Sequence, residues 1–301
     1  MDNRLGFDAL DTMLTLHIYI VQLNTEKAEQ LMTRWRLLKP EPHDAFFNMA
    51  TDEAMLEARI KDRVPNTLRL YRWRPSAVSI GRFQSIWKEV NLGECAVSGV
   101  DVVRRISGGG AVYHDSEDEI TYSVVMKRRD LGTDDVVQAY YYICNGLIEA
   151  ARMVGVNAEY DRGNARHCPN ITVKKRKISG NAQANRKDTI LQHGTLLVKV
   201  DFNKMFTFLK IPCKDACIDF QSTAKRKISS LTSELGRLLS ISQVCEAIRS
   251  GFEEALGIEL AEGVLTDYEV NLAQRLEREK FVTRNWNFEG RTENLSLKPV
   301  S

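Results

Sequence analysis

The spacing of hydrophobic residues along the chain predicts four amphipathic helices. In one of them, apolar side chains recur at every fourth position and therefore share one helix face; they are Val244, Ile248, Phe252 and Leu256. A second helix begins with Thr266 followed by Glu269, which is the spacing of a capping box. In a third, Thr133 can cap the first turn and Gly155 can end the last. The predicted helices cover residues 47–61, 134–154, 242–256 and 266–280.

Shorter runs of β-branched and other apolar residues, bounded by turn residues, predict strands. These runs cover residues 100–105, 111–114, 120–126, 171–177 and 189–200. Several of them are joined by short turns, which favours antiparallel neighbours. Strands and helices do not alternate regularly, as they would in a doubly wound sheet. The pattern therefore predicts an α+β fold.

The composition is that of a chain able to form a compact domain. Of its 301 residues, 43% are hydrophobic and 27% are charged, which is enough to bury a substantial core. The apolar stretch at residues 10–23 is interrupted by polar residues, so no run reaches the length of a membrane span. The stretch also lacks the basic start and the cleavage site of a signal peptide. We therefore expect a cytoplasmic protein that does not enter a membrane.

Positive charge is concentrated in one part of the chain. The net charge of +2 is too small to indicate a general nucleic-acid surface. Between Arg162 and Lys187, however, there are eight Lys or Arg residues and no Asp or Glu. An anion of the size of ATP accounts for such a stretch more economically than a polynucleotide. We therefore expect no nucleic-acid partner.

The six cysteines form neither a dense disulfide framework nor the paired CxxC spacing of a zinc site. Cys144 and Cys245 lie among apolar residues at helical spacing, which is typical of core positions. The roles of Cys213 and Cys217 stay open at this point. We expect no structural metal.

A glycine-rich motif points to an anion. In RRISGGGAVYHD, residues 104–115, two arginines precede three glycines that lead into a predicted strand. Glycine permits positive φ, so several N–H groups can converge on phosphate oxygens while arginine supplies charge. The run alone is equally compatible with a hairpin turn that has basic flanks.

A second motif, KISGNAQANRKDTILQHGTLLV at residues 177–198, removes that ambiguity. It places a lysine before a Ser-Gly turn and a His-Gly pair in a predicted strand. Together the two motifs resemble the lipoate-protein ligase A family, and the similarity extends over about residues 35–288, from FNMATDEAML near residue 47 to RNWNF near residue 284. An ordered match of this length is far more specific than an isolated glycine motif.

The resemblance implies the biotinyl/lipoyl ligase fold, related to class II synthetases, with a mainly antiparallel mixed sheet flanked by helices. It implies a catalytic domain at residues 32–290, preceded by an N-terminal extension, residues 1–31, that need not be native, and followed by a polar tail, residues 291–301. Longer family members continue into a small C-terminal domain. In short forms that domain is a separate protein, so the resemblance implies a partner subunit.

The resemblance also implies ATP-dependent activation of lipoate to lipoyl-AMP, with Mg²⁺, and transfer of the lipoyl group to a lysine of a lipoyl domain. The acceptors would be the E2 subunit of 2-oxoacid dehydrogenases or the glycine-cleavage H protein. Lys177 would hold the reacting carbonyl and the α-phosphate. Arg105 and one stretch of backbone would contact the phosphates, namely Gly108, Gly109, Gly110, Ala111, Val112 and Tyr113.

Two histidines lie inside the matched motifs. His114 and His193 are candidate substrate contacts, although packing roles fit them equally well. Gly194 would permit a close approach of the backbone beside His193. Octanoate is a plausible alternative to lipoate, because specificity for the acyl chain comes from burial of its methylenes.

The chain departs from the ligase pattern just before the lysine. Ligases of the family carry Asn-Asp there, and the acidic residue helps to place magnesium, whereas this chain has Pro169 and Asn170. The departure coincides with Cys168. Related octanoyltransferases use a loop cysteine to carry the acyl group from acyl carrier protein without ATP, and a thiol among positive charges suits that role. The alternative interpretation is therefore an octanoyltransferase that forms a thioester on Cys168.

A third interpretation is a non-catalytic module that binds lipoyl or biotinyl ligands. A binding module has no need of Lys177 at the reacting junction. The acyl group used, the carrier protein modified and the oligomeric state are not decided by the sequence.

Overall fold

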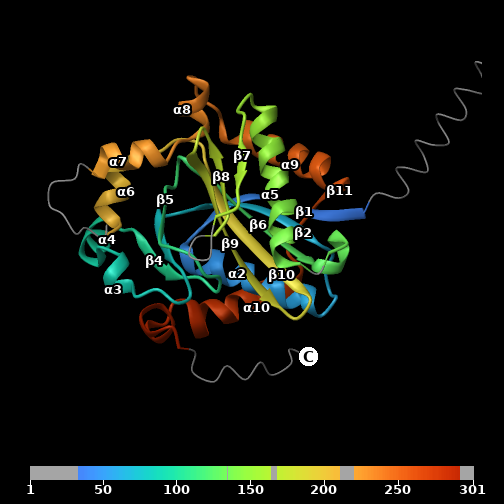
Figure 1. Cartoon of the computed structure of the whole chain (residues 1–301). Helices are drawn as coiled ribbons and strands as arrows, with labels where there is room; N and C mark the ends of the chain where they lie inside the picture. The colour runs from blue at the N-terminus through green and yellow to red at the C-terminus, as the bar shows by residue number, and fades with distance from the viewer. Residues whose placement is uncertain (1–32, 134, 164–167, 211–219, 292–301) are drawn as a thin grey trace, which may run out of the picture.

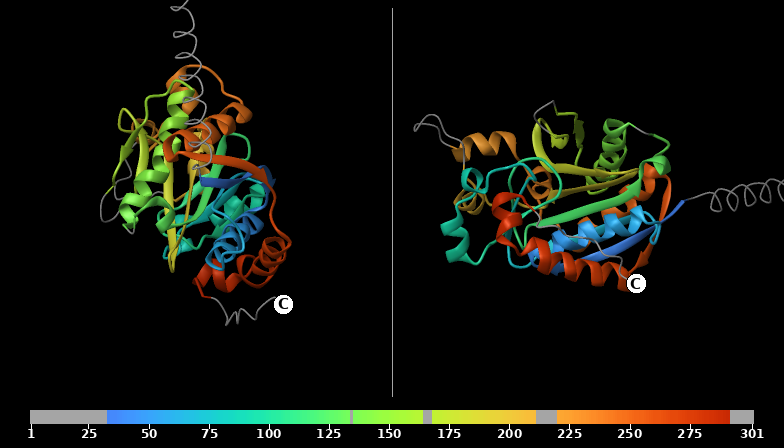
Figure 2. Two further views of the ribbon diagram at one scale, coloured as in Figure 1. Left: turned by 90° about the vertical axis from the view of Figure 1, so that its right-hand side faces the viewer. Right: turned by 90° about the horizontal axis from the view of Figure 1, so that it is seen from below.

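The computed structural model describes residues 33–133, 135–163, 168–210 and 220–291. A large mixed sheet forms the centre of the molecule, and helices cover both of its faces (Figures 1 and 2). The strands are β1 (Thr33–His43), β2 (Thr67–Trp73), β3 (Ala77–Ile80), β4 (Asp101–Arg104), β5 (Val112–His114), β6 (Glu119–Lys127), β7 (Glu159–Asp161), β8 (Asn170–Val173), β9 (Arg176–Arg186), β10 (Thr189–Leu197) and β11 (Ile258–Gly263). The α-helices are α2 (Ala45–Ile60), α3 (Ile86–Glu89), α4 (Leu92–Ser98), α5 (Val136–Met153), α6 (Phe202–Phe208), α7 (Phe220–Lys227), α8 (Leu231–Leu235), α9 (Ile241–Leu256) and α10 (Asp267–Leu276).

The large sheet has the strand order β11-β1-β2-β6-β10-β9-β8-β7. Its first two pairings, β11 with β1 and β1 with β2, are parallel. All later pairings are antiparallel. The mainly antiparallel mixed sheet expected from the sequence is therefore confirmed.

The main core lies between one face of this sheet and the helices α5 and α9. Strand β6 alternates, so that Tyr122 and Val124 enter this core and pack near Ile143 of α5 and Phe252 of α9. The opposite sheet face packs against α2 and α10, which lie side by side (Figure 2). Burying both faces leaves the strand ends and their loops as the place for a site.

A second, smaller sheet carries the glycine-rich motif. Its order is β4-β3-β5, with β3 parallel to β4 and antiparallel to β5. The glycine loop, residues 105–111, connects β4 to β5 and projects toward the large sheet. The motif therefore forms a loop between two strands that both pair with β3, and it is not a two-residue hairpin turn.

The predicted helices are all present, with small shifts at their ends. Thr266 caps α10 with a capping box to Glu269, as the spacing predicts. Helix α5 begins later than predicted, because Asp135 rather than Thr133 accepts the first backbone N–H groups. Helix α10 ends at Leu276, and the next turn is π-helical rather than α-helical.

The prediction of one strand at residues 171–177 is wrong. The chain reverses there, so that β8 ends at Val173 and β9 begins at Arg176. The two turn residues, Lys174 and Lys175, have φ of 49° and 64°. Turns of this kind are usually signalled by Asn or Gly; two lysines carry no such signal, and the hairpin could not be predicted.

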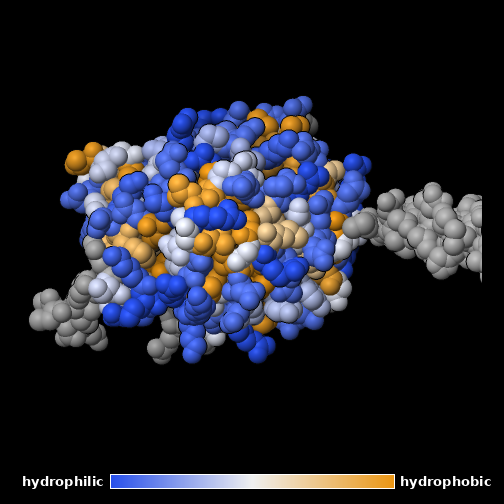
Figure 3. Space-filling view, turned by 90° about the horizontal axis from the view of Figure 1, so that it is seen from above, coloured by the Kyte–Doolittle hydropathy of each residue, from blue (hydrophilic) through white to orange (hydrophobic). Residues whose placement is uncertain are grey.

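In the described part of the chain, no helix is long and apolar enough to cross a membrane. The described residues also contain no cluster of three or more potential metal ligands of the His, Cys, Asp or Glu type. Cys213, Cys217, the predicted N-terminal extension at residues 1–31 and all but the first residue of the predicted tail at residues 291–301 lie outside the described residues. The face in Figure 3 has a largely hydrophilic rim, with hydrophobic side chains gathered near its centre.

Candidate functional site

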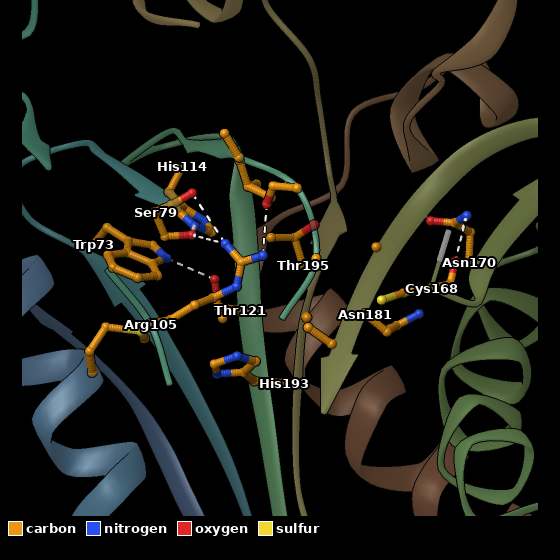
Figure 4. A pocket seen from close by; sticks show the side chains of 18 of the residues that line it. Trp73, Ser79, Arg105, His114, Thr121, Cys168, Asn170, Asn181, His193 and Thr195 are labelled. Atoms are coloured by element: carbon orange, nitrogen blue, oxygen red, sulfur yellow. Dashed lines mark hydrogen bonds between the residues drawn. The ribbon is translucent and has the colours of Figure 1, made fainter. Parts of the chain in front are cut away.

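A cavity of about 510 Å³ lies where the glycine loop meets β6, β9 and β10 (Figure 4). Its lining includes most of the residues selected from the two sequence motifs. They are Arg105, Gly109, Gly110, Ala111, Val112, His114, Cys168, Asn170, Lys177, His193 and Gly194. Gly108 and Tyr113 do not line it. The Tyr113 ring instead stacks on Phe208 in a separate cluster, with 5.1 Å between centroids, because β5 turns alternate side chains to opposite faces.

Arg105 holds the glycine loop in shape. Its Nη1 donates to the carbonyl and hydroxyl oxygens of Ser79, at 3.2 and 3.1 Å. Its Nη2 donates to the carbonyl oxygens of Gly108 and Gly110, at 2.8 and 2.7 Å. The terminal nitrogens predicted to contact phosphate are thus directed at protein oxygens.

Gly109 makes this arrangement possible. Its φ is 90°, a conformation that residues with a Cβ rarely adopt. A Cβ added there would lie 3.0 Å from Nη2 of Arg105 and 3.8 Å from Sγ of Cys168. Gly109 therefore lets both the guanidinium and the sulfur approach the loop backbone.

The two histidines of the motifs line the cavity, and both nitrogens of each ring have partners inside the protein. His193 contacts Asp52 through Nδ1 at 2.9 Å and Ser107 through Nε2 at 2.6 Å. His114 contacts Glu119 through Nδ1 at 2.6 Å and Ser79 through Nε2 at 2.8 Å. In the neutral ring, Nδ1 donates to the carboxylate and Nε2 accepts a hydroxyl proton. His193 therefore holds the glycine loop through Ser107, and His114 holds Ser79, which in turn accepts a hydrogen bond from Arg105.

Asp52, on helix α2, is the carboxylate that contacts His193. It also accepts hydrogen bonds from Arg69 at 2.9 Å, from Tyr71 at 3.1 Å and from Ser123 at 2.9 Å. Burial alone would raise the pKa of Asp52, but the hydrogen bond from His193 and the charge of Arg69 outweigh it and the pKa is lowered. The side chain is therefore an anion that joins α2 to three strands.

Cys168 and Lys177 come together from opposite sides of a hairpin. Cys168 precedes β8, and Lys177 is in β9, where its side chain folds over Gly180. A Cβ on Gly180 would lie 2.5 Å from Nζ of Lys177 and 3.9 Å from Oδ1 of Asn170. Asn170 in turn donates from Nδ2 to the carbonyl oxygen of Cys168 at 3.2 Å. The sequence motif thus builds one compact group around the sulfur.

The electrostatic character of this group is positive. Burial lowers the pKa of Arg105 to about 10, although the nearby Cys168 partly opposes the effect. Burial, and then the charge of Arg105, lowers the pKa of Lys177, and Cys168 again opposes. In the described part of the chain, neither cation has a carboxylate within ion-pair distance. The cavity is therefore suited to an anion beside Cys168.

The described cations of the basic stretch at residues 162–187 do not converge on this cavity. Arg176 pairs with Glu234, and Arg186 donates to Glu53 and Glu57 at 2.8 and 2.6 Å. Lys174 and Lys175 are exposed on the β8–β9 turn. Of the cations in this stretch that the structure describes, only Lys177 lines the cavity. For these described residues, the prediction that the stretch serves one ATP-sized anion is wrong.

The donor set does not fit Mg²⁺. Hard divalent cations require oxygen ligands, usually with at least one carboxylate. Among the described residues that line the cavity there is no Asp or Glu, and Asn170 offers only an amide. Asp52 and Glu119 lie behind the histidines and are already bonded to them.

Part of the lining was not selected in the sequence analysis. It includes Met49, Tyr71 and Trp73, and also Asn181 of β9. Trp73 stacks on His114, with 4.1 Å between centroids, and donates from Nε1 to Thr121 at 2.8 Å. The sequence signals available were the FNMATDEAML block for Met49 and the KISGN block for Asn181.

Comparison with known proteins gives a family and two kinds of activity. Residues 44–253 match the family described as the lipoyl protein ligase A/B catalytic domain. The octanoyltransferase LipM of Brevibacillus brevis is 34% identical over 275 residues, covering 85% of this chain and 99% of the relative. The octanoyltransferase LipM of Symbiobacterium thermophilum is 36% identical over 272 residues, covering 85% and 98%.

Solved structures share the fold. The bi-partite lipoate protein ligase from Thermoplasma acidophilum, described with its E2 lipoyl domain, superimposes with a TM-score of 0.74 at 27% identity, covering 88% of this chain and 99% of that chain. Lipoate-protein ligase A bound with ATP gives a TM-score of 0.73 at 28% identity, covering 87% and 100%. The lipoyl ligase fold expected from the sequence is confirmed.

The principal functional prediction, ATP-dependent activation and ligation of lipoate, is wrong on this comparison. Five curated relatives at 31 to 36% identity, each covered over nearly its whole length, are octanoyltransferases. This agrees with the missing carboxylate at Asn170 and with the sulfur in the cavity. The family resemblance itself is confirmed, because the match spans more than half of the chain. The chain is an enzyme of the family described as the lipoyl protein ligase A/B catalytic domain.

Proposed function

We propose that this protein is an octanoyltransferase that carries the octanoyl group as a thioester on Cys168. The donor is octanoyl-acyl carrier protein, and the acceptor is a lysine of a lipoyl-domain protein. The observation that carries the proposal is the position of Cys168 in the cavity, beside Lys177 and Arg105, in a lining without carboxylates. Two cations beside a sulfur stabilise the thiolate, which is the nucleophilic form.

In the first half-reaction, Lys177 takes the proton of the Cys168 thiol. The lowered pKa of Lys177, caused by burial and then by Arg105, makes the neutral amine accessible for this step. The thiolate attacks the carbonyl carbon of the donor thioester, a new C–S bond forms and the donor C–S bond breaks. The departing sulfur receives the proton from Lys177. One thioester has been exchanged for another.

In the second half-reaction, the acceptor lysine attacks the thioester on Cys168. An amide bond forms, the C–S bond breaks and Cys168 leaves as a thiolate. The attacking amine loses one proton, which neutral Lys177 accepts and then returns to the sulfur. Both half-reactions use the same cysteine and lysine, and neither consumes a nucleotide.

Apolar residues in the lining of the cavity can contact the acyl chain. They include Met49, Trp73, Val112 and Ala182, and the cavity of about 510 Å³ is within the usual range for small ligands. Each methylene buried there contributes roughly 0.8 kcal/mol. Lipoic acid is bound in the structure of a related protein, and in this protein lipoate would occupy the same space.

This mechanism has no step for ATP or Mg²⁺ and does not require the separate small-domain subunit inferred from short ligases. Acceptor proteins of the lipoyl-domain type remain part of the proposal. Their type is supported by the solved bi-partite ligase that is described with an E2 lipoyl domain. Cytoplasmic localisation stays a prediction.

The test is transfer to an apo lipoyl domain, followed by intact mass. One reaction contains octanoyl-acyl carrier protein without ATP, and the other contains lipoate with ATP and Mg²⁺. We expect an octanoyl mass gain in the first reaction and no gain in the second. The Cys168→Ser variant should give no gain in either, whereas Cys245→Ser, on α9, should behave like the unmodified protein. Gain only with ATP, or full activity of Cys168→Ser, would contradict the proposal.

A further inference from the structure

Asn181 is buried in the wall of the cavity on the same side as Cys168, opposite Trp73 and Arg105 (Figure 4). It belongs to β9, where it pairs with Gly194 of β10. A Cβ on Gly194 would lie 2.5 Å from Oδ1 of Asn181. Gly194, the glycine of the His-Gly motif, therefore leaves the space that the Asn181 amide occupies.

A chain of hydrogen bonds fixes which way the amide points. Gln183 donates from Nε2 to Oε1 of Gln192 at 2.7 Å, and Gln192 donates from Nε2 to the hydroxyl of Tyr122 at 2.8 Å. Tyr122 has one proton and donates it to Oδ1 of Asn181 at 2.7 Å. Ser179 donates to the same oxygen at 3.3 Å. The Asn181 oxygen is therefore engaged, and the Nδ2 group faces the other way.

The Nδ2 group has donor capacity to spare. It carries two protons. It donates to the carbonyl oxygen of Pro169, the residue after Cys168, at 3.4 Å, which is long for a hydrogen bond. A buried amide donor that is only weakly engaged is unfavourable unless a ligand uses it. Pro169 follows Cys168 directly in the chain, and Asn181 and Cys168 line the same cavity, so Nδ2 lies near the residue that would carry the thioester.

We infer that Asn181 is a catalytic residue whose Nδ2 donates a hydrogen bond to the thioester carbonyl oxygen as it becomes an oxyanion. The inference rests on the proposed thioester on Cys168. In each half-reaction the carbonyl carbon becomes tetrahedral and its oxygen gains negative charge, which collapses back as the C–S bond breaks. A donor already oriented by Tyr122 and Gln192 stabilises that charge without reorganising. Tyr122 acts as a positioning residue for it.

The experiment measures the rate at which octanoyl-acyl carrier protein acylates the enzyme, by intact mass in a single turnover at saturating donor. Asn181→Asp keeps the size of the side chain but removes the N–H donor. We expect its acylation rate to fall on the order of 100-fold, as for other single oxyanion donors, with little change in the donor concentration at half-maximal rate. Tyr122→Phe should give a smaller fall, because the amide can then rotate.

The control is Asn185→Ala, an exposed asparagine on the same strand, which should acylate at the unmodified rate. Far-ultraviolet circular dichroism and thermal unfolding identify variants that have lost the fold, and Asn181→Ser, which restores a shorter donor, should recover part of the rate. An acylation rate of folded Asn181→Asp within threefold of the unmodified protein would overturn the inference. Absence of acylation in the unmodified protein would instead overturn the proposed function.

Discussion

At the scale of single residues, the decisive feature is the grouping of a sulfur with a buried arginine and a half-buried lysine. The terminal nitrogens of Arg105 donate hydrogen bonds to Ser79 and to the glycine loop. Its role in the site is therefore mainly to supply positive charge and to fix the conformation of that loop. Lys177 folds over Gly180 and keeps its amine near Cys168. A site built in this way favours chemistry through a thiolate over the binding of Mg²⁺.

The Lys177→Arg variant tests the proposed proton transfer. Arginine keeps the positive charge but does not give up its proton at any relevant pH. Loss of a general base typically costs 100-fold or more, so we expect acylation of Cys168 to slow by at least about 100-fold. Stopped-flow or quenched single-turnover assays measure this. Lys175→Arg, on the neighbouring exposed turn, is the matched control and should show no change. Equal rates for both variants would remove Lys177 from proton transfer.

At the scale of elements, two antiparallel strands bring the motifs together. The register of β9 with β10 places Asn181 opposite Gly194 and Ala182 opposite His193. The β8–β9 hairpin then returns the Cys168 segment over Gly180. The turn of that hairpin is unusual, because Lys174 and Lys175 both have positive φ.

Replacing the turn residues with Asn and Gly, as Lys174→Asn with Lys175→Gly, should stabilise the protein. A left-handed conformation costs a residue other than glycine or asparagine about 1 kcal/mol or more. We therefore expect the free energy of unfolding to rise by roughly 1 kcal/mol, measured by urea denaturation. The lost contact of Lys174 with Glu234 is long, at 4.0 Å, and the Lys174 side chain is exposed. Glu234 keeps Arg176 as a closer partner, so the loss should matter little. Unchanged or lower stability would show that the lysines are not strained there.

At the scale of the whole molecule, the sequence predicts what local signals determine. Thr266 and Glu269 specify a helix start by themselves, and that start is confirmed. The contacts that shape the site join distant residues, such as His193 and Asp52, which are 141 positions apart. No local pattern encodes the pairing of α2 with β10. The sequence also could not show that Tyr113 faces away from the cavity. Which face of β5 is turned to the cavity depends on how the small sheet packs against the rest of the protein.

The contact of Asp52 with His193 predicts that the stability of the fold decreases at acidic pH. The lowered pKa of Asp52 means that the folded state favours its anion. Its contribution to stability is complete above the ordinary value of 3.8 and is lost as the pH falls through the lower folded value. We expect the free energy of unfolding to decrease over that range in urea titrations. Asp52→Asn should be less stable at neutral pH and show a shallower acid decrease. An identical acid profile for both proteins would contradict this role of Asp52.

The central claim is that Cys168 carries the octanoyl group. The most direct measurement mixes the protein with octanoyl-acyl carrier protein, without ATP and without acceptor, and determines the intact mass of the enzyme and the mass of its peptides. We predict one octanoyl group on the peptide that contains Cys168, removed when an apo lipoyl domain is added. Transfer to the lipoyl domain without any acylated enzyme, or acylation retained in Cys168→Ser, would contradict the account.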